Sequence, residues 1–512
     1  MRISQRQMFS TYTSQMNTSL SSVMESNNQA GTGNRVNRPS DDPANMARIM
    51  MYRSSLSNIE NYKSNIGEAS GWLNLADHTM SQVDDLISRI RALDLQGANG
   101  IINADNRESI AMELRGYLGE LITMANTPYL DQHLFGGHKT GKPPFVEGLG
   151  VTCRDEELAK GDFVASGGTK YSMAIQFTQS GDLKSQQPTF VWSADGGDTW
   201  QNGSWVNGKM VAGGVEIAAY PPTTDTSSPE WAAWGHVTAV PTAPAPSEKE
   251  SAGGTWLYVR PTAVYQGDDH DTQVAQVYNG TGPAPSLVQA DGHFTRDVNV
   301  RIDDTSGAEI LYSYSLDNGS TWIQGKAPAG SAQLTVPGGF LKIDGAAGDV
   351  FSDGQQFTIH PYRADINFEI SPYQTVTVNM VGKDIFGGLY QEPFTDYPKP
   401  VQGNNLFETL GRLIGYAECN DQDGVGSSLD ELTECLKHVT TKHTEIGARE
   451  NRLEVAFETL SMRELSEYDG MRTIESVDTI TLMTKLAQQQ LTYNTVLKSS
   501  AMIMQMSLMN FI

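Results

Sequence analysis

The feature that most constrains this chain is a row of apolar and small residues in its N-terminal part. Between residues 59 and 90 these residues recur at alternating steps of three and four, and no charged residue interrupts the row. This spacing brings one side chain of each turn onto one helix face and forms the seam of a coiled coil. The row consists of Ile59, Tyr62, Ile66, Ala69, Leu73, Ala76, Met80, Val83, Ile87 and Ile90. We therefore expect a long helix that buries this seam against a second helix.

The beginning of this helix is also marked in the sequence. Asp41 or Asp42 can accept hydrogen bonds from free backbone amides, and Pro43 suits the first helical position because proline lacks the amide hydrogen. A second helix is expected over residues 106–125, where apolar residues again fall on one side. Residues 41–144 are therefore predicted to be mainly helical.

Both ends of the chain carry apolar stripes that one pair of helices would not cover. At the C-terminal end Leu482, Leu486, Tyr493, Val496 and Ile503 widen the stripe into a broad apolar face. A two-helix pair leaves part of such a face in water, so we expect helices from other copies of the chain to cover it. The predicted assembly interface consists of Phe9, Tyr12, Met16, Leu20, Val23, Ile480, Met483, Ala487, Leu497, Ala501, Met504, Leu508 and Phe511.

The middle of the chain has a different pattern. Between about residues 145 and 400 the helical spacing gives way to short alternating runs rich in glycine, threonine, serine, proline and aromatic residues. Such runs are typical of β-strands joined by turns. The sequence SADGGDTW at residues 193–200 recurs in related form as SLDNGSTW at residues 315–322. This weak repeat predicts two related β modules in tandem.

The predicted fold class is a multi-domain α and β protein. Its N-terminal and C-terminal helices are expected to form an antiparallel coiled coil, with a large all-β region of two modules inserted between them. The expected domains are residues 1–40 with 470–512 (terminal helices), 41–144 with 401–469 (helical coiled coil), 145–284 (first β module), and 285–400 (second β module and return strands).

Each copy of the repeat resembles the Asp box, a hairpin turn of bacterial sialidases and other β proteins. In this turn the carboxylate accepts hydrogen bonds, glycine supplies a positive φ, and tryptophan packs against the module. A glycosidase needs two carboxylates across a sugar cleft, and no such pair is identifiable. A glycan-binding or glycan-cleaving surface protein is therefore a less favoured alternative. The residues predicted to form these turns are Asp195, Gly197, Trp200, Asp317, Gly319 and Trp322.

Nothing else in the sequence indicates chemistry. No motif for nucleophilic, phosphoryl-transfer, metal or dinucleotide chemistry occurs, so we predict no enzyme activity and no catalytic, cofactor-binding or metal-binding residues. Cys153, Cys419 and Cys435 form no CxxC pair and are interpreted as free thiols. His438 and His443 do not fall on one helix face, which makes zinc improbable. The acidic segment 268–271 is interpreted as solvated.

The net charge and the hydropathy of the chain limit the kinds of partner that it can bind. The formal net charge of −24 would repel nucleic acid and anionic membrane surfaces. The first 30 residues contain no apolar core of a secretory signal peptide. No run approaches the roughly 20 apolar residues that cross a bilayer. Taken alone, these features favour a cytoplasmic protein without membrane insertion.

Several segments together resemble the flagellin superfamily, specifically its hook-associated protein 3 branch. In the N-terminal part they are residues 1–4, 33–43 and 134–145, and in the C-terminal part residues 376–386, 405–410 and 446–453. The resemblance covers about the first 145 and the last 140 residues. Asn34 stands where the branch commonly has lysine, and the β insertion is larger than in its short members.

The resemblance implies a structural subunit of the bacterial flagellum at the junction of hook and filament. It implies a homo-oligomeric tubular ring around an export channel, with the paired terminal helices as the inner tube. The implied partners are hook-associated protein 1, flagellin, and a cytoplasmic export chaperone on the C-terminal helix. The implied location is extracellular, after type III export without a cleaved signal peptide, which revises the cytoplasmic expectation. Flagellin itself, the filament subunit, is the nearest alternative.

Overall fold

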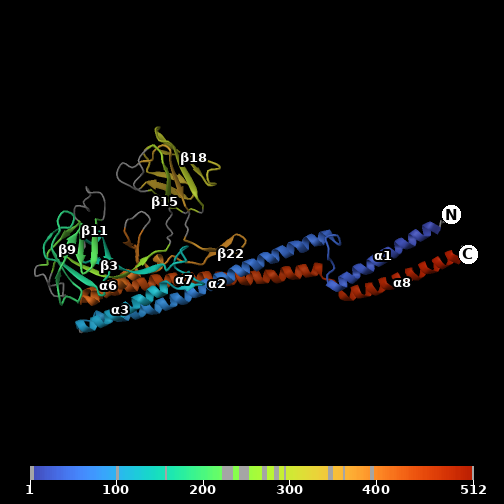
Figure 1. Ribbon diagram of the computed structural model, residues 1–512, viewed down its shortest axis with the longest axis horizontal. Coiled ribbons are helices and arrows are strands. Elements are labelled where there is room, and N and C mark those ends of the chain that lie inside the picture. Colours follow the sequence, from blue (N-terminus) through green and yellow to red (C-terminus); the bar gives the residue numbers. More distant parts are fainter. Residues whose placement is uncertain are drawn as a thin grey trace. The chain divides into compact units, whose positions relative to one another are not determined.

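The computed structural model describes residues 5–99, 103–155, 158–221, 234–240, 253–267, 274–281, 288–292, 294, 296–343, 350–360, 364–391 and 397–509. Within these ranges both terminal parts are helical and the middle is rich in β-strands (Figure 1), as predicted. The chain forms two compact units. The first contains Met1–Glu68, Glu369–Thr375 and Arg452–Ile512, and the second contains Ala69–Phe368 and Val376–Asn451.

The helices begin where the sequence provides caps. At the start of α2, Asp42 Oδ1 accepts a hydrogen bond from the amide of Asn45 at 3.1 Å. At the start of α3, Asn103 Oδ1 accepts one from the amide of Asn106 at 3.0 Å. The helices are α1 (Gln5–Thr32), α2 (Pro43–Gly97), α3 (Ala104–Ala125), η1 (Leu158–Lys160), α5 (Lys383–Phe386), α6 (Leu406–Glu418), α7 (Gln422–Glu475) and α8 (Thr479–Met509).

The apolar row in α2 has a counterpart in α7. Every member of the predicted α2 row is buried except Tyr62, which is half-buried. In α7 an apolar residue recurs at every seventh position from residue 425 to residue 460, and each of these residues is buried. A strict seven-residue repeat keeps one face of a helix turned toward a partner. The α7 row consists of Val425, Leu432, Val439, Ile446, Leu453 and Leu460.

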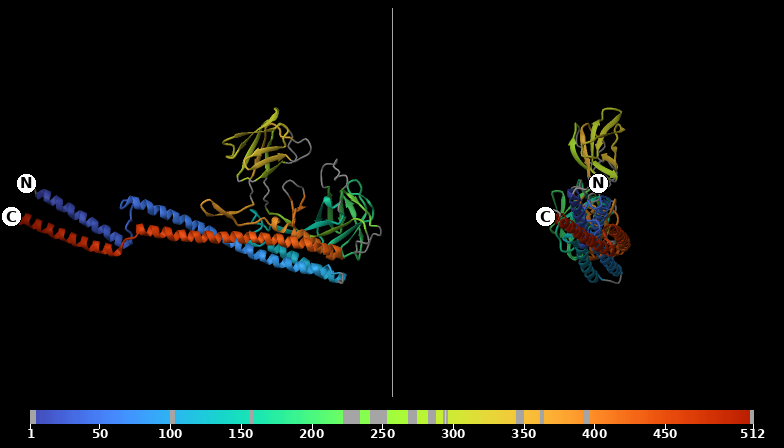
Figure 2. Two further views of the ribbon diagram at one scale, coloured as in Figure 1. Left: turned by 180° about the vertical axis from the view of Figure 1, so that it is seen from behind. Right: turned by 90° about the vertical axis from the view of Figure 1, so that its right-hand side faces the viewer.

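Ion pairs join α2 to α7 within each unit. In the first unit Lys63 Nζ lies 2.8 Å from Glu464 Oε2. In the second unit the two ring nitrogens of His443 each lie 3.0 Å from a carboxylate oxygen, one of Asp77 and one of Asp84. These contacts hold the two long helices side by side, as Figure 2 also shows.

In the first unit, α1 and α8 run along each other, with the two chain ends at the same end of the pair (Figure 1). The linkers that follow α1 and precede α8 also lie against each other. The amide of Arg35 donates a hydrogen bond to the carbonyl of Glu475 at 2.7 Å, and the amide of Val477 donates to the carbonyl of Gly33 at 3.1 Å. These backbone bonds fix the point at which both chain segments leave the α1–α8 pair.

The second unit contains two groups of strands. In the first group β13 pairs antiparallel with β3 and β5 and parallel with β24, and a neighbouring sheet has the order β4-β11-β10-β9. The strands are β3 (Phe145–Cys153), β4 (Asp162–Gly167), β5 (Met173–Phe177), β6 (Gly181–Asp182), β7 (Phe190–Ser193), β8 (Gln201–Asn202), β9 (Ser204–Val206), β10 (Lys209–Ala212), β11 (Val215–Tyr220), β12 (His236–Val237), β13 (Trp256–Tyr265), β24 (Leu389–Tyr390) and β25 (Lys399–Pro400).

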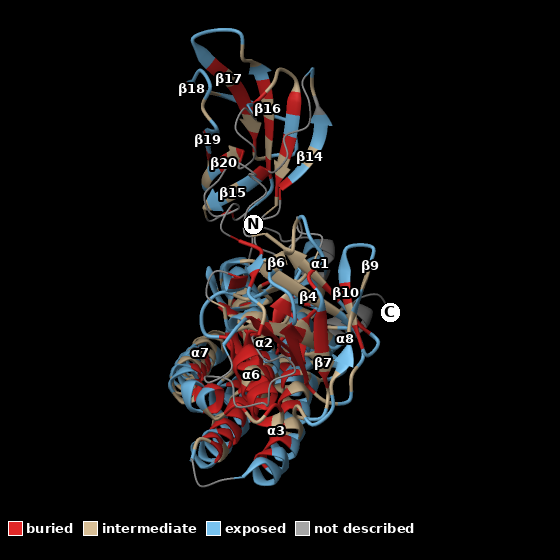
Figure 3. Ribbon diagram, turned by 90° about the vertical axis from the view of Figure 1, so that its left-hand side faces the viewer, coloured by how far each residue is buried: buried red, intermediate tan, exposed pale blue. Residues whose placement is uncertain are grey.

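The second group of strands forms sheets in the orders β14-β21-β16-β17-β18 and β15-β20-β19. Each group has its own cluster of buried apolar residues. Figure 3 shows in red where buried residues lie along the ribbon. The strands are β14 (Val274–Asn279), β15 (Val288–Gly292), β16 (Val298–Asp304), β17 (Glu309–Ser315), β18 (Ile323–Pro328), β19 (Gln333–Val336), β20 (Gly339–Ile343) and β21 (Gln355–Ile359). Two small hairpins are β1 (Pro128–Tyr129) with β2 (Gln132–His133), and β22 (Asn367–Ser371) with β23 (Gln374–Thr377).

A buried ion pair attaches α6 to β13. Arg260 Nη2 lies 2.6 Å from Glu408 Oε2, and both side chains are almost fully buried. Thr262 Oγ1 donates to Glu408 Oε1 at 2.6 Å, and Arg260 Nε donates to Thr152 Oγ1 at 2.5 Å. Burial disfavours the charged form of Glu408, but Arg260 and Thr262 outweigh it and lower the pKa of this carboxyl. Gly411 permits the close approach, because a Cβ there would lie 2.2 Å from a backbone oxygen of β13.

The buried row of α2 ends in a carboxyl group. Asp94 follows Ile87 by seven residues and is fully buried, and among the residues that the structure covers neither of its carboxyl oxygens has a hydrogen-bond partner. Burial raises the pKa of Asp94 from 3.8 to about 7. The folded chain therefore binds this proton more tightly than the unfolded chain. It follows that the contribution of Asp94 to the free energy of unfolding falls as pH rises from 3.8 to about 7.

Replacing Asp94 by leucine should stabilise the chain at pH 8 by about 1–3 kcal/mol, because it removes an unpaired buried carboxylate and continues the apolar row. The gain should be smaller at pH 5, where the carboxyl group of the parent keeps its proton. Thermal unfolding followed by circular dichroism at both pH values measures the effect. Asp85→Leu, at an exposed position of the same helix, is the matched control and should give no gain. A less stable Asp94→Leu protein at pH 8 would contradict this interpretation.

Candidate assembly surface on the terminal helices

The contact between α1 and α8 uses rows that contain polar residues. On α8 the side chains of Leu482, Leu486, Tyr493 and Val496 are buried or half-buried, and Gln489 continues their three-four spacing. On α1 the row of half-buried or buried residues is Tyr12, Met16, Ser19, Val23, Ser26 and Ala30. Serine and glutamine at these positions make the pair less apolar than the α2–α7 seam.

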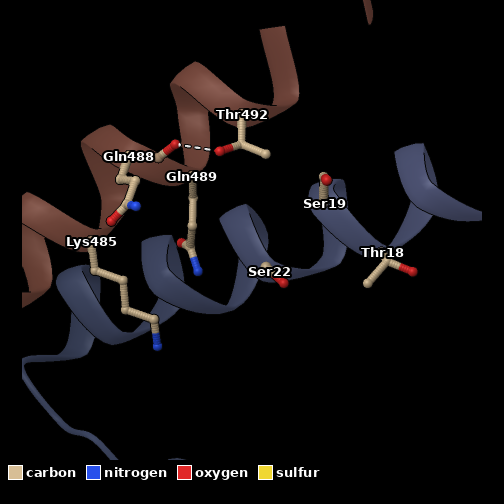
Figure 4. A pocket seen from close by; sticks show the side chains of 7 residues that line it. All are labelled: Thr18, Ser19, Ser22, Lys485, Gln488, Gln489 and Thr492. Atoms are coloured by element: carbon tan, nitrogen blue, oxygen red, sulfur yellow. Dashed lines mark hydrogen bonds between the residues drawn. The ribbon is translucent and has the colours of Figure 1, made fainter. Parts of the chain in front are cut away.

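A polar hollow of about 330 Å³ lies where these polar residues meet. Figure 4 shows its hydroxyl and amide side chains and the single lysine, drawn from both helices. Gln489 Oε1 is shielded from solvent and has no hydrogen-bond partner among the residues described. An incompletely packed, polar contact contributes little to the stability of a helix pair. The hollow is lined by Thr18, Ser19, Ser22, Lys485, Gln488, Gln489 and Thr492.

The outward side of α8 carries a row of exposed apolar residues, which Gln490 and Asn494 interrupt. The exposed fractions are 80% for Ile480, 50% for Met483, 68% for Leu491, 39% for Leu497 and 64% for Met502. Scattered exposed apolar residues are ordinary on a protein surface, but a row that follows one side of a helix marks a contact surface. We call these five residues, together with Ala487 and Ala501, the outer face of α8.

The predicted interface residues fall into three classes. Ile480, Met483, Ala487, Leu497 and Ala501 are exposed on the outer face, whereas the residues that widen the predicted stripe, from Leu482 to Val496, pack against α1. On α1, Tyr12, Met16 and Val23 are half-buried and Leu20 is 37% exposed. The structure does not describe the side chains of Phe9, Ile503, Met504 and Leu508, or any part of Phe511.

Sequence reasoning named the large apolar residues of the α1–α8 contact row but missed its polar members, for an identifiable reason. The residues at 482, 486, 489, 493, 496 and 500 have the same three-four spacing as the predicted stripe, but glutamine and serine interrupt their apolar character. The same is true of Ser19 and Ser26 on α1. Small serine side chains let two helices approach closely, and this use of polar residues is not visible in a search for apolar periodicity.

The two repeated turns have closely matching hydrogen bonds. Asp195 Oδ1 accepts bonds from the Ser193 hydroxyl at 2.6 Å and the Thr199 amide at 2.9 Å. Asp317 Oδ1 accepts the corresponding bonds, from the Ser315 hydroxyl and the Thr321 amide, both at 2.8 Å. Hydrogen bonds from Thr321 and Ser315 lower the pKa of Asp317 to about 2. These bonds account for the carboxylates without a catalytic role.

The other turn residues also lie in conformations that fit a hairpin. Gly197 and Gly319 have φ values of 101° and 91°, which favour glycine. Trp200 Nε1 donates to the Gly197 carbonyl at 2.9 Å. Trp322 is 39% exposed, and the guanidinium carbon of Arg301 lies 4.8 Å from the centroid of its ring system.

The described parts of the chain contain no cluster of three or more His, Cys, Asp or Glu side chains placed to hold a metal ion. None of the helices in those parts is long and apolar enough to cross a bilayer. Cys153, Cys419 and Cys435 form no disulfide, and burial raises the pKa of Cys153 to about 12, far from that of a reactive thiolate. The acidic segment 268–271 lies outside the described residues.

Comparison with known proteins gives consistent matches. Residues 3–140 match the family described as the bacterial flagellin N-terminal helical region. The chain is 29% identical over 151 residues to flagellar hook-associated protein 3 of Salmonella typhimurium, covering 29% of this chain and 48% of that protein. It is 28% identical over 167 residues to flagellar hook-associated protein 3 of Escherichia coli, covering 32% and 53% of the two proteins. The matched part of the chain thus spans about half the length of these curated relatives.

A similar solved structure is that of the flagellar junction protein FlgL from Legionella pneumophila. The superposition covers 84% of this chain and 100% of that protein, with 15% identity and a TM-score of 0.30.

Asp317→Ala should lower the melting temperature of the chain at pH 7, because it removes the carboxylate that accepts three hydrogen bonds in the turn. The pKa of Asp317 is depressed to about 2, so its contribution to stability is present above 3.8 and is lost as pH falls toward 2. The difference between Asp317→Ala and the parent should therefore shrink at pH 3. Ser320→Ala, in the same turn, is the control. An unchanged melting temperature at pH 7 would contradict the structural role.

Proposed function

We propose that this chain, whose N-terminal helical region is of the flagellin type, is a structural subunit of the bacterial flagellum that joins hook to filament. The similarity to hook-associated protein 3 supports this role over that of a filament subunit. We propose no enzymatic activity, because the carboxylates of Asp195 and Asp317 accept hydrogen bonds within their own hairpin turns.

The outer face of α8 is the observation that carries this proposal. One side of α8 packs on α1, and the opposite side presents a row of apolar residues to water. Burying apolar surface is worth roughly 25 cal/mol per Å², so this face is most stable when another helix covers it. The occupant we propose is a terminal helix of a second copy. Repetition of this contact around a central channel gives a tubular ring with the terminal helices innermost.

The proposal extends to the domain arrangement. Residues 1–40 with 470–512 form the inner tube, and residues 41–144 with 401–469 form a surrounding antiparallel coiled coil built on α2 and α7. The β modules, 145–284 and 285–400, face outward. The two buried rows of α2 and α7 support the coiled coil, because both have the repeat that such a seam requires.

The same surface defines the proposed partners. At the two ends of the ring the outer face would meet the corresponding helices of hook-associated protein 1 and of flagellin. Before assembly, an apolar face of this kind needs protection from water, which fits an export chaperone that binds the C-terminal helix. The proposed location is extracellular, at the hook–filament junction, after type III export.

Ala487→Asp should abolish assembly without unfolding the isolated chain. Ala487 is exposed in the single chain, so its replacement should leave the melting temperature unchanged. In the assembled ring the new carboxylate would be buried without a partner, at a cost of about 3 kcal/mol or more, or roughly 100-fold in each contact. The measurements are motility and flagellin in the culture supernatant after complementation of a null strain, together with thermal melting of the purified variant.

Thr492→Asp is the matched control, because Thr492 is exposed on α8 and lines the polar hollow instead of the outer face. It should retain motility. We expect Ala487→Asp to give non-motile cells that lose flagellin to the medium. Normal motility of Ala487→Asp would exclude the outer face as an assembly contact, and a lower melting temperature of the isolated variant would place Ala487 in the chain's own core.

A further inference from the structure

His443 occupies an unusual position between the two long helices of the second unit. Its Nδ1 lies 3.0 Å from Asp84 Oδ2, and its Nε2 lies 3.0 Å from Asp77 Oδ1. Asp77 and Asp84 are seven residues apart, which is about two helical turns, so both project from the same side of α2. His443 lies on α7 between the buried residues Val439 and Ile446. The imidazole therefore bridges two turns of one helix from the other.

The hydrogen-bond chemistry of imidazole decides which form of the ring fits. Neutral imidazole has one N–H donor and one nitrogen lone pair, whereas imidazolium has two N–H donors. A carboxylate only accepts. With a carboxylate oxygen 3.0 Å from each nitrogen, only imidazolium satisfies both contacts. In the neutral ring one lone pair would face a carboxylate oxygen, and that contact would become repulsive.

The negative charges around His443 also favour the protonated form of its ring. Glu450, about two helical turns further along α7, is a third carboxyl group near His443. Its Oε1 is shielded from solvent and has no hydrogen-bond partner among the described residues. Partial burial disfavours the charged ring of His443, but hydrogen bonds and charges of Asp84 and Asp77 outweigh it and raise its pKa. The pKa of Glu450 is raised mainly by burial and to a smaller extent by the charge of Asp77.

Thr440, Lys442 and His78 lie nearby, but none of them supplies the positive charge that His443 gives to Asp77 and Asp84. Thr440 Oγ1 donates to Asp84 Oδ1 at 3.3 Å, which leaves the charge of Asp84 unchanged. Lys442, the neighbouring cation on α7, lies 3.1 Å from Glu445 and is engaged there. His78 on α2 contacts Gln82 at 3.3 Å. Once His443 loses its proton, the site therefore holds three carboxyl groups, and no other cation in the described parts of the chain forms an ion pair with them.

We propose that His443 with Asp77 and Asp84 forms a proton-sensitive clasp that strengthens the α2–α7 contact when the ring is charged and weakens it when the ring is neutral. The sign follows from the raised pKa. The folded chain binds the His443 proton more tightly than the unfolded chain, so the clasp stabilises fully below the usual histidine pKa of 6.5 and loses its effect as pH rises through the raised pKa. The inference does not depend on the proposed flagellar role.

The test compares the full-length parent with His443→Gln, since glutamine is neutral at every pH used. Helix unfolding is followed by circular dichroism at pH 6 and pH 9. At pH 6 the variant should melt about 2–4 °C below the parent, as expected for the loss of one charged contact. At pH 9 the difference should nearly vanish. Because both proteins contain Asp94, its own pH dependence cancels in the comparison. His78→Gln is the matched control and should equal the parent at both pH values.

A second measurement keeps the proposal testable if His443→Gln folds poorly. Two-dimensional NMR of the parent labelled at its histidines should show one ring, absent from the His443→Gln spectrum or from that of His443→Asn, with a titration midpoint above 6.5. Asp84→Asn should lower that midpoint. A midpoint at or below 6.5 in the parent, or a melting difference that is equal at pH 6 and pH 9, would overturn the clasp.

Discussion

The packing of α2 against α7 is the constraint on which the rest of this chain depends. The two helices come from opposite ends of the sequence, and each carries a long row of apolar residues that would be unstable in water alone. Covering one row with the other requires the intervening chain to leave the helices and return. The buried pair of Arg260 and Glu408 then fixes one point of the β region to α6, because an uncompensated charge at that depth would be costly.

The contact between the terminal helices α1 and α8 is more polar than the contact between α2 and α7. Their mutual contact contains serine, threonine and glutamine around a polar hollow, and the side of α8 turned away from α1 carries a further row of exposed apolar residues. The arrangement is understandable if the outer face of α8 is reserved for other subunits. Stability of the ends then comes from assembly, and stability of the second unit comes from its own cores.

Local patterns predicted much of this arrangement. The α2 row and the start at Pro43 could be read from spacing and capping chemistry, and the turn geometry around Asp195 and Asp317 follows from the known behaviour of aspartate and glycine. Features that need a partner distant in sequence could not be predicted. Asp94 continues an apolar repeat, and only the packing shows that it is buried with no hydrogen-bond partner among the described residues. His443 shows no metal-ligand spacing, and its two carboxylates lie more than 350 residues away along the chain.

The central claim is that the chain is confined to the junction of hook and filament. Immunoelectron microscopy of intact flagella, with antibodies against the β region of this chain, tests that claim most directly. The account predicts label in a single narrow band between hook and filament on each flagellum. Label along the whole filament would identify a filament subunit instead, and label on the cell surface with none on the flagellum would contradict the flagellar assignment itself.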